Sequence, residues 1–353
     1  YTCQYSPTSG LVLHAQYASN ESTFLKMSDG KQAPPCPRVT IIVAPRERFE
    51  QAEMSLASCF ETTDTPFEMI YVDGGSPREI AVVLKHEVER RGHTYIRRDG
   101  YLTPNDARNM ALPHVRTDYI AFIDNDVVFQ PGWLDALIKC ADETNSGLVT
   151  PTILVGPAKR MPDLNIHHAG GILNIETGET GKTMYRRHGF EHQPYLATKG
   201  QLKRQETGCT EFHVVLARKA MIDEIGPFDP NLVGFTDEID MALAARAKGW
   251  KIFYEPDSVV AYAVGKKLTW RDRPFFCVHW SPGRVMRAER YFYDKWGLTH
   301  DFTRQENFLR DHRRHAFPFK RLQKLVGWRV TVTLTTLICA TISALASPRL
   351  IRP

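Results

Sequence analysis

Two aspartates one residue apart, Asp124 and Asp126, follow the apolar run 119–123. A continuous β-prone run of this kind indicates a buried strand. Residues just past such a strand lie at the carboxyl edge of an open α/β sheet, where ligands bind. Carboxylates held side by side repel each other unless a cation or a shared proton lies between them. The pair therefore predicts either a site where Mg²⁺ or Mn²⁺ holds a phosphate, or a polar turn.

Further carboxylates lie at the ends of other predicted strands and helices. Asp73 follows the apolar run 67–72 and precedes two glycines. It is either a turn residue or a hydrogen-bond acceptor for a nucleobase or ribose. A second group, Asp237, Glu238 and Asp240, opens an Ala-rich helical segment. Because the helix dipole favours acidic residues in a first turn, this group by itself requires no function.

Alternating strands and helices must position these groups. The pattern predicts strands at 39–44, 67–72, 93–97 and 119–123, separated by helices at 49–61, 80–88, 103–112 and 133–141. It then predicts strands at 207–217 and 251–256, and helices at 221–225, 237–246 and 284–296. Such alternation forms βαβ units. We therefore predict an α/β fold with a doubly wound, mainly parallel sheet, helices on both faces and an apolar C-terminal helix.

Two stretches lack this alternation. Residues 1–37 show no sustained periodicity beyond a short predicted strand at 11–14, and they end in a proline-rich run. Residues 156–205 are rich in glycine, histidine, threonine and charged residues, so we predict a loose insertion that covers one side of the site. Its paired histidines, His167 and His168, are interpreted as surface residues.

Length, charge and cysteine usage limit the class of protein. The chain of 353 residues is long enough to bury a core, and its 45 basic and 40 acidic residues are mixed to give a net charge of +5. We therefore expect no nucleic-acid partner. The seven cysteines are scattered, odd in number and without a Cys-x-x-Cys pair. This usage predicts reduced thiols, no zinc site and a cytoplasmic location.

The C-terminal segment combines basic and apolar residues. Basic residues concentrate between Arg304 and Arg329, and residues 330–346 carry no charge. A spanning helix needs about 20 apolar residues, so the apolar segment is borderline. The basic flank matches the cytoplasmic side of a membrane. The segment therefore predicts either membrane association or a helix that packs on the domain or on an oligomer partner.

A set of short motifs occurs in order between residues 38 and 264. The motifs are Ile42–Pro45, Asp73–Ser76, Ala107–Asn109, Asp124–Asp126, Gly226–Asp229, Asp237–Met241 followed by Arg246, and Glu255–Pro256. Each is weak alone, but their order and spacing resemble family 2 glycosyltransferases of the GT-A (Rossmann-like) fold. The stretch Pro45-Arg46-Glu47-Arg48-Phe49 also resembles an uncharacterised bacterial subgroup. The resemblance divides the chain into an N-terminal arm at 1–37, a GT-A domain at 38–300 and a basic tail at 301–353.

The resemblance implies a donor-binding role for residues at several strand ends. Asp73 would bind the nucleoside, and the same pocket would be lined by Pro45, Arg46 and Glu47. Arg108 and Asn109 would support that pocket.

The resemblance also implies the metal and catalytic residues. Asp124 would face the ribose or the metal, and Asp126 would bind the metal. Glu238 falls where the family keeps its catalytic base, but the Asp-Glu order is inverted here, so Asp237 stays open as the base. Many members add a histidine ligand after the last strand. His279 ranks first for that place and His213 second, with water completing the shell if neither binds.

The function implied by the resemblance is a metal-dependent inverting glycosyltransferase. It would move a sugar from a nucleotide-sugar donor to a hydroxyl of a glycan, a lipid or a small molecule. UDP is the expected nucleotide, with GDP and dTDP open, and Mn²⁺ or Mg²⁺ is the expected cofactor. The alternatives are a nucleotidyltransferase and a non-catalytic module that binds a sugar nucleotide or glycan. The expected location is cytoplasmic, either in solution or on the inner membrane face through the C-terminal helix.

Overall fold

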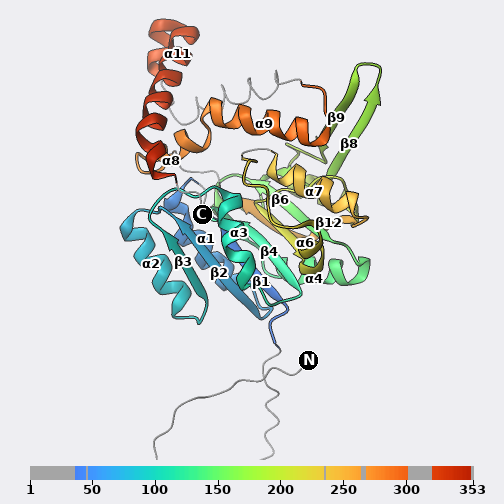
Figure 1. Ribbon diagram of the computed structural model, residues 1–353. Helices are drawn as coiled ribbons and strands as arrows, with labels where there is room; N and C mark the ends of the chain where they lie inside the picture. Colours follow the sequence, from blue (N-terminus) through green and yellow to red (C-terminus); the bar gives the residue numbers. More distant parts are fainter. Residues whose placement is uncertain (1–35, 45–46, 234–235, 264–267, 301–319, 351–353) are drawn as a thin grey trace, which may run out of the picture. The chain divides into compact units, whose positions relative to one another are not determined.

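Strand β1 (Val39–Ala44) lies inside a ten-stranded sheet (Figure 1). The structure is a computed structural model that describes residues 36–44, 47–233, 236–263, 268–300 and 320–350. Its main strands follow the order β10-β12-β6-β11-β4-β1-β2-β3. The expected arm at 1–37 and the strand at 11–14 fall almost entirely outside the described residues.

One half of the sheet is parallel, as predicted. Strand β1 pairs in parallel with both β2 (Phe67–Gly74) and β4 (Tyr119–Asp124), and β2 pairs in parallel with β3 (Thr94–Arg98). Strands β2 and β3 therefore lie on one side of β1, and β4 lies on the other. Such a switch point opens a crevice at the carboxyl ends of the strands, which is where ligands bind in open α/β sheets. Asp73 and Asp124 both lie at this edge.

The other half mixes directions. Strand β11 (Val214–Arg218) runs antiparallel to β4 and to β6 (Leu148–Val155), whereas β12 (Ile252–Tyr262) runs parallel to β6. Short antiparallel strands complete this half: β5 (Val127–Phe129), β7 (Asn165–His168) and β10 (Gln205–Glu206).

Two strand boundaries differ from the prediction. The strand predicted at 207–217 begins only at Val214, because residues 207–213 are irregular. Within them, Thr207 Oγ1 accepts from the Gly171 amide and donates to the Gly171 carbonyl, which holds this segment against the hairpin. Strand β12 continues past Pro256, where the prediction ended, to Tyr262. Its register shifts between Glu255 and Val259, and such a bulge tolerates a proline.

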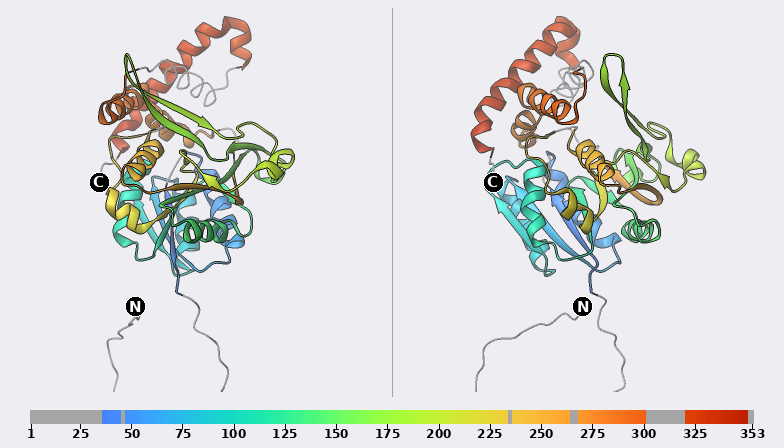
Figure 2. Two further views of the ribbon diagram at one scale, coloured as in Figure 1. Left: turned by 90° about the vertical axis from the view of Figure 1, so that its right-hand side faces the viewer. Right: turned by 45° about the vertical axis from the view of Figure 1, so that its right-hand side comes forward.

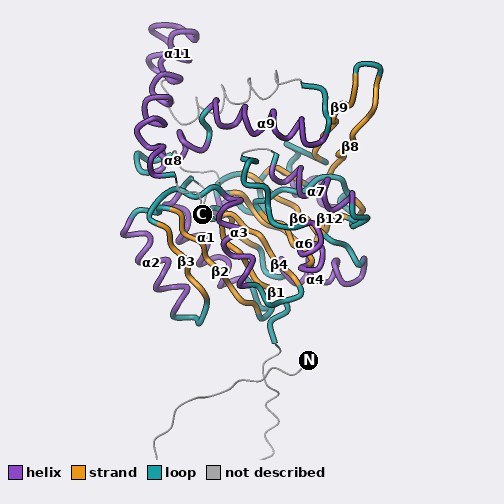
Figure 3. The backbone as a smooth tube through the Cα atoms, viewed as in Figure 1, coloured by secondary structure: helices purple, strands orange, loops and turns teal. Residues whose placement is uncertain are grey.

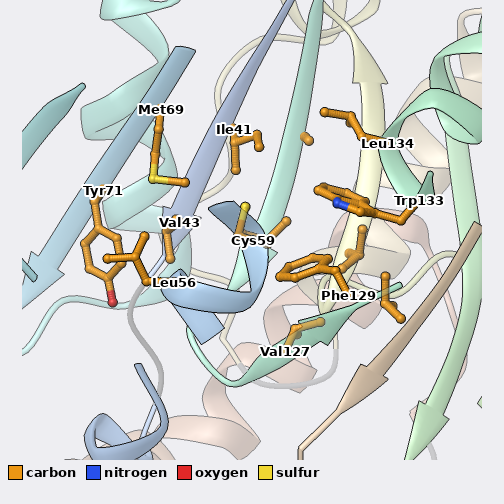
Figure 4. Close-up of a cluster of buried hydrophobic side chains, with 14 of the residues drawn as sticks. Ile41, Val43, Leu56, Cys59, Met69, Tyr71, Val127, Phe129, Trp133 and Leu134 are labelled. Atoms are coloured by element: carbon orange, nitrogen blue, oxygen red, sulfur yellow. The ribbon is translucent and has the colours of Figure 1, made fainter. Parts of the chain in front are cut away.

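Helices cover both faces of the sheet (Figure 3). On one face the side chains of Ile41 and Val43 pack with Cys59 and Trp133 (Figure 4). The helices of this face are α1 (Ala52–Thr62), α2 (Arg78–Glu89) and α4 (Trp133–Thr144). The opposite face packs on α3 (Pro104–Ala111), α6 (Lys219–Ile225), α7 (Asp237–Ala247) and α9 (Pro282–Trp296). This arrangement confirms the predicted fold class.

A two-stranded hairpin projects from the sheet side that also carries α7 and α9 (Figures 1 and 2). It consists of β8 (Gly171–Gly178) and β9 (Gly181–His188), and a short helix α5 (Tyr195–Thr198) follows it. The insertion predicted at 156–205 therefore lies beside the site, but the expected loose structure was wrong, because regular strands form most of it. Most side chains of the hairpin are exposed or half-buried, so the strands lack the apolar alternation that would reveal them.

The C-terminal helix α11 (Lys320–Ala346), bent at Gly327, packs against α8 (Asp272–His279). Ile338, Cys339 and Ile342 meet the α8 side chains in a small apolar cluster. Just beyond the helix, the carbonyl of Arg349 accepts a hydrogen bond from the Tyr101 amide at 2.7 Å. The helix is thus docked on the domain along one face. Short 3-10 turns lie at Phe49–Gln51, Leu112–His114, Ala158–Arg160, Lys199–Gln201 and Ser347–Arg349.

Away from this cluster α11 also carries exposed apolar side chains, with Leu337 and Leu345 60% and 78% accessible. The segment Gln323–Arg349 is, among the described helices, long and apolar enough to cross a membrane, and 22% of its most apolar window is buried. The helix thus packs on the domain, as one interpretation of the sequence expected, and it also has the length and apolar surface that the membrane interpretation requires.

Candidate active site

The segment Asp124-Asn125-Asp126 links the end of β4 to the start of β5. Its backbone is held on both sides, since the Asp124 amide donates to the His213 carbonyl at 3.2 Å and the Asp126 carbonyl accepts from the Ala263 amide at 2.9 Å. The side chains of Asp124 and Asp126 are nearly enclosed, at 1% and 3% accessibility. This is the predicted location at the carboxyl edge of the sheet.

Two arginines lie near these carboxylates. Arg48 Nε lies 3.7 Å from Asp126, and Arg108 Nη2 lies 3.9 Å from Asp124. Both distances exceed that of a direct hydrogen bond. Two buried carboxylates side by side fit a divalent cation that prefers oxygen ligands, such as Mg²⁺ or Mn²⁺.

His213 lies close enough to Asp124 and Asp126 to be affected by their charges. Burial lowers the pKa of His213, but its hydrogen bond with Glu211 and the charges of Asp124 and Asp126 outweigh burial and raise it. His279 is buried on α8 between Phe275 and Trp280, with ring centroids 5.8 and 4.8 Å away. A role for His279 as a metal ligand stays a prediction.

The predicted nucleoside residues are partly described. Pro45 and Arg46 lie outside the described residues. Glu47 is buried, and its Oε1 accepts a hydrogen bond from Trp280 Nε1 at 2.8 Å. Trp280 follows α8, so this bond ties the loop after β1 to that helix.

Asp73 is fully enclosed, at 0% accessibility. Its Oδ1 accepts from the Ser76 amide at 3.0 Å, which is the turn role considered from the sequence. Its Oδ2 accepts hydrogen bonds from Tyr95 and Arg97. A ligand could reach this carboxylate only if one of these two side chains moved.

Arg108 connects three elements from inside the protein. Its guanidinium donates to Asp237 Oδ2 at 2.9 Å, and it stacks over the Phe212 ring at 3.5 Å. The same group lies 3.9 Å from Asp124, so it joins α3, α7 and the end of β4. Its neighbour Asn109 makes a bond to each of the backbone groups of Phe228, at 2.7 and 2.8 Å. Arg108 and Asn109 therefore hold the neighbouring elements of the site in place through contacts inside the protein.

Glu238 lies in the first turn of α7 and is held by Arg186 of the hairpin. Arg186 Nη2 donates to Oε1 of Glu238 at 2.8 Å and to Oε1 of Glu211 at 3.1 Å. Burial and the nearby Glu211 charge raise the pKa of Glu238, and Arg186 opposes this rise. Although burial raises the pKa of Glu211 too, the His213 hydrogen bond and the Arg186 charge outweigh it and lower that pKa. The pKa of Glu211 is therefore lower than that of Glu238.

Sequence reasoning missed this network. Arg186 and His188 stand two residues apart on β9, and Glu211 and His213 are also two apart. That spacing of polar residues was the available signal. His168 was interpreted as a surface residue, but it is fully buried where β7 pairs with β6 of the main sheet. Burial keeps the pKa of His168 well below its usual range.

The sequence profile described as "Glycosyl transferase family 2" matches residues 40–226, more than half of the chain. The chain belongs to glycosyl transferase family 2. The match covers β1, β2, β4 and the Asp124–Asp126 segment. The family and the bacterial resemblance predicted from the motifs are thereby confirmed, and the domain limits 38–300 and 301–353 stay predictions.

Curated relatives of this family resemble a part of the chain. An "Uncharacterized glycosyltransferase" of Rickettsia felis is 26% identical over 147 residues, which are 40% of this chain and 24% of that protein. A "Pre-mycofactocin glycosyltransferase" of Mycobacterium tuberculosis is 24% identical over 161 residues, which are 45% of this chain and 30% of that protein. The matched region thus spans less than a third of either relative.

Solved structures of glycosyltransferases show a distant likeness. GalNAc-T7 with UDP, GalNAc and Mn²⁺ aligns over 84% of this chain and 57% of that chain, at 15% identity and a TM-score of 0.49. The mannosyltransferase PcManGT from Pyrobaculum calidifontis, with GDP-Man and Mn²⁺, aligns over 88% of this chain and 86% of that chain, at 16% identity and a TM-score of 0.45.

Proposed function

We propose that this protein is a metal-dependent inverting glycosyltransferase that moves a sugar from a nucleotide-sugar donor to a hydroxyl acceptor. The observation that carries the proposal is the link through Arg108. This residue pairs with Asp237 at 2.9 Å and lies 3.9 Å from Asp124. The Asp124–Asp126 segment and the first turn of α7 are therefore close to each other. Transfer requires a carboxylate pair for the leaving group and a separate carboxylate for the acceptor.

Asp124 and Asp126 are the residues that would hold Mn²⁺ or Mg²⁺. A bound cation of this kind stabilises the charge that develops on the departing nucleoside diphosphate. The chain's own contribution is to keep the two carboxylates enclosed, which strengthens their attraction for a cation.

Glu238 is the proposed catalytic base. The acceptor oxygen attacks the anomeric carbon, the bond from that carbon to the diphosphate oxygen breaks, and the hydroxyl proton passes to Glu238. The transition state resembles an oxocarbenium ion, and a single displacement inverts the anomeric centre. Arg186 holds the Glu238 carboxylate in place at 2.8 Å.

The nucleoside pocket is proposed around Asp73 and Glu47, together with Pro45 and Arg46. Asp73 already accepts hydrogen bonds from Tyr95 and Arg97. Donor binding at Asp73 would therefore exchange one of these partners for a nucleobase or ribose group. UDP is the proposed nucleotide, with GDP and dTDP as the alternatives that the test includes.

We further propose that the protein associates with the cytoplasmic face of a membrane through α11. The helix docks on α8 through Ile338, Cys339 and Ile342, and it leaves Leu337 and Leu345 exposed. An apolar helix face beside a basic flank suits binding at a lipid surface. A helix lying on the membrane also keeps the hydrogen bond between Tyr101 and Arg349, which ties its end to the domain.

The test of the transferase is donor binding and slow donor hydrolysis across UDP-, GDP- and dTDP-sugars, with Mn²⁺, Mg²⁺ or EDTA. We expect one nucleotide class to bind only with a divalent cation. Asp126→Ala should abolish this binding, whereas Asp163→Ala, which removes an exposed aspartate, should leave it unchanged. Absence of binding to every donor under every metal condition would remove the proposal.

A further inference from the structure

The hairpin and the turn before β11 bring four histidines around one carboxylate. His167 and His168 end β7, His188 ends β9, and His213 and Glu211 precede β11. Glu211 Oε1 lies 3.7 Å from His188 Nε2, and its Oε2 lies 3.4 Å from His213 Nδ1. The two oxygens of one carboxylate thus face different histidines.

We propose that His168, His188 and Glu211 form a binding site for a divalent transition-metal ion of the Zn²⁺ class. One ligand atom from each of the three residues lies within 4.8 Å of the others. The Nδ1 atoms of His168 and His188 face each other at 2.8 Å. Two imidazoles and a carboxylate are a ligand set that Zn²⁺ accepts, with water in the fourth position.

The burial of His168 distinguishes this group. Its side chain is fully enclosed, and its Nε2 finds no hydrogen-bond partner among the described residues. A buried polar nitrogen without a partner is costly in a folded protein. Imidazole is also the commonest metal ligand in its neutral form. A metal bound to Nε2 would satisfy this nitrogen, whereas a metal bound to Nδ1 would replace the contact with His188.

A second group shares the same carboxylate: His167, Glu211 and His213. We favour the first group because His213 is already engaged by the charges of Asp124 and Asp126, and its ring lies 4.3 Å from that of Tyr262. His167 is also less enclosed than His168. The two groups predict different effects of substitution, so experiment can separate them.

The proposed ion would cross-link β7, β9 and the turn before β11. Glu211 shares Arg186 with Glu238, so the same ion would fix the hairpin next to the residue proposed as base. The site contains no cysteine, which is why cysteine spacing gave no sign of it. None of its three residues belongs to the Asp124–Asp126 segment, so the two metal sites can be tested separately.

The experiment measures metal on the full-length protein without any donor. The protein is loaded with ZnCl₂, desalted, and its zinc content determined, and Co²⁺ loading adds a visible absorption spectrum that reports imidazole coordination. We expect about one retained ion, and His168→Ala and His188→Gln should each lower Zn²⁺ affinity by about 100-fold or more, beyond the 10–100-fold that outer-shell changes cost. His192→Asn, a change of an exposed histidine in the neighbouring turn, is the matched control.

Circular dichroism establishes that each variant is folded, and two different ligand variants guard against a loss caused by misfolding. Retention of zinc by Asp126→Ala supports a site separate from the donor metal. The proposal is overturned if the unmodified protein retains no zinc, if Asp126→Ala loses it, or if His167→Ala and His213→Ala lose it while His168→Ala keeps it. Donor binding is measured separately, so a failed zinc result leaves the transferase proposal standing, and the reverse also holds.

Discussion

Arg186 donates a hydrogen bond to Oε1 of Glu238 at 2.8 Å, across the space between the hairpin and α7. The same nitrogen reaches Glu211 at 3.1 Å. One buried cation thus pairs with two buried carboxylates. Because each carboxylate raises the cost of ionising the other, the hairpin controls the protonation of the proposed base.

Replacing Arg186 should shift the pH dependence of the reaction. The Arg186 charge opposes the rise in the pKa of Glu238, so Arg186→Met should raise that pKa further. The acid limb of the rate profile then moves to higher pH, and the rate near neutrality falls about tenfold for each pKa unit. Arg186→Lys keeps the charge and should shift the limb less. The measurement is kcat/KM against pH, and an unmoved limb in Arg186→Met would contradict the proposed role.

Two substitutions distinguish the base from its neighbour. Glu238→Gln should lower kcat by about 10²–10⁴-fold with donor affinity unchanged, because only proton transfer is lost. Asp237→Asn should chiefly destabilise the protein, since it breaks the buried pair with Arg108, at a cost of about 3–5 kcal/mol.

Steady-state kinetics and urea unfolding of both variants provide the measurements, and Glu206→Gln, an exposed change, serves as the control. The opposite pattern, with Glu238→Gln active and Asp237→Asn folded but inactive, would assign the base to Asp237.

Acid should destabilise the fold through His167. Burial lowers the pKa of His167 from 6.5 to about 4, so the unfolded chain binds this proton at a higher pH than the folded protein does. Stability is therefore complete above about pH 6.5 and is lost as the pH falls toward 4, by on the order of 3 kcal/mol. Urea unfolding in EDTA at several pH values measures the loss. His167→Gln should flatten this dependence, and an equal slope in both proteins would rule out His167 as its source.

Mild oxidation should join α11 to α8. The Cys277 and Cys339 thiols interact directly, and this contact, together with burial, raises the pKa of Cys277. Oxidation should form a Cys277–Cys339 disulfide, detected by mass spectrometry of peptides, and Cys339→Ser should abolish it. Cys59 and Cys140, which are buried elsewhere, should stay reduced. If α11 leaves the domain, the cross-link will not appear.

The exposed face of α11 should bind lipid. The double change Leu337→Glu and Leu345→Glu places charge on that face and should release the protein from anionic liposomes in a sedimentation assay. Val82→Glu makes the same kind of change at an exposed position of α2 and should leave binding intact. Recovery of the unmodified protein entirely in the supernatant would remove the membrane proposal.

The sequence by itself determined the parallel half of the sheet and the residues at its edge. Runs such as 39–44 and 119–123 are apolar throughout because both faces of these strands are buried, and that signal is local. Asp73, Asp124 and the acidic start of α7 could be located for the same reason, since each follows or opens a strongly patterned element. The order of these motifs was enough to indicate the family.

Only the tertiary structure decided which side chains meet. Arg186 and Glu238 are 52 residues apart, and the hairpin that carries Arg186 has no apolar pattern of its own. His168 and His188 come together through the pairing of β7 with β6 and the return of β9. Such contacts depend on the packing of separate segments rather than on the spacing within one. The partners of Glu238, and the histidines around Glu211, could therefore be found only from the fold.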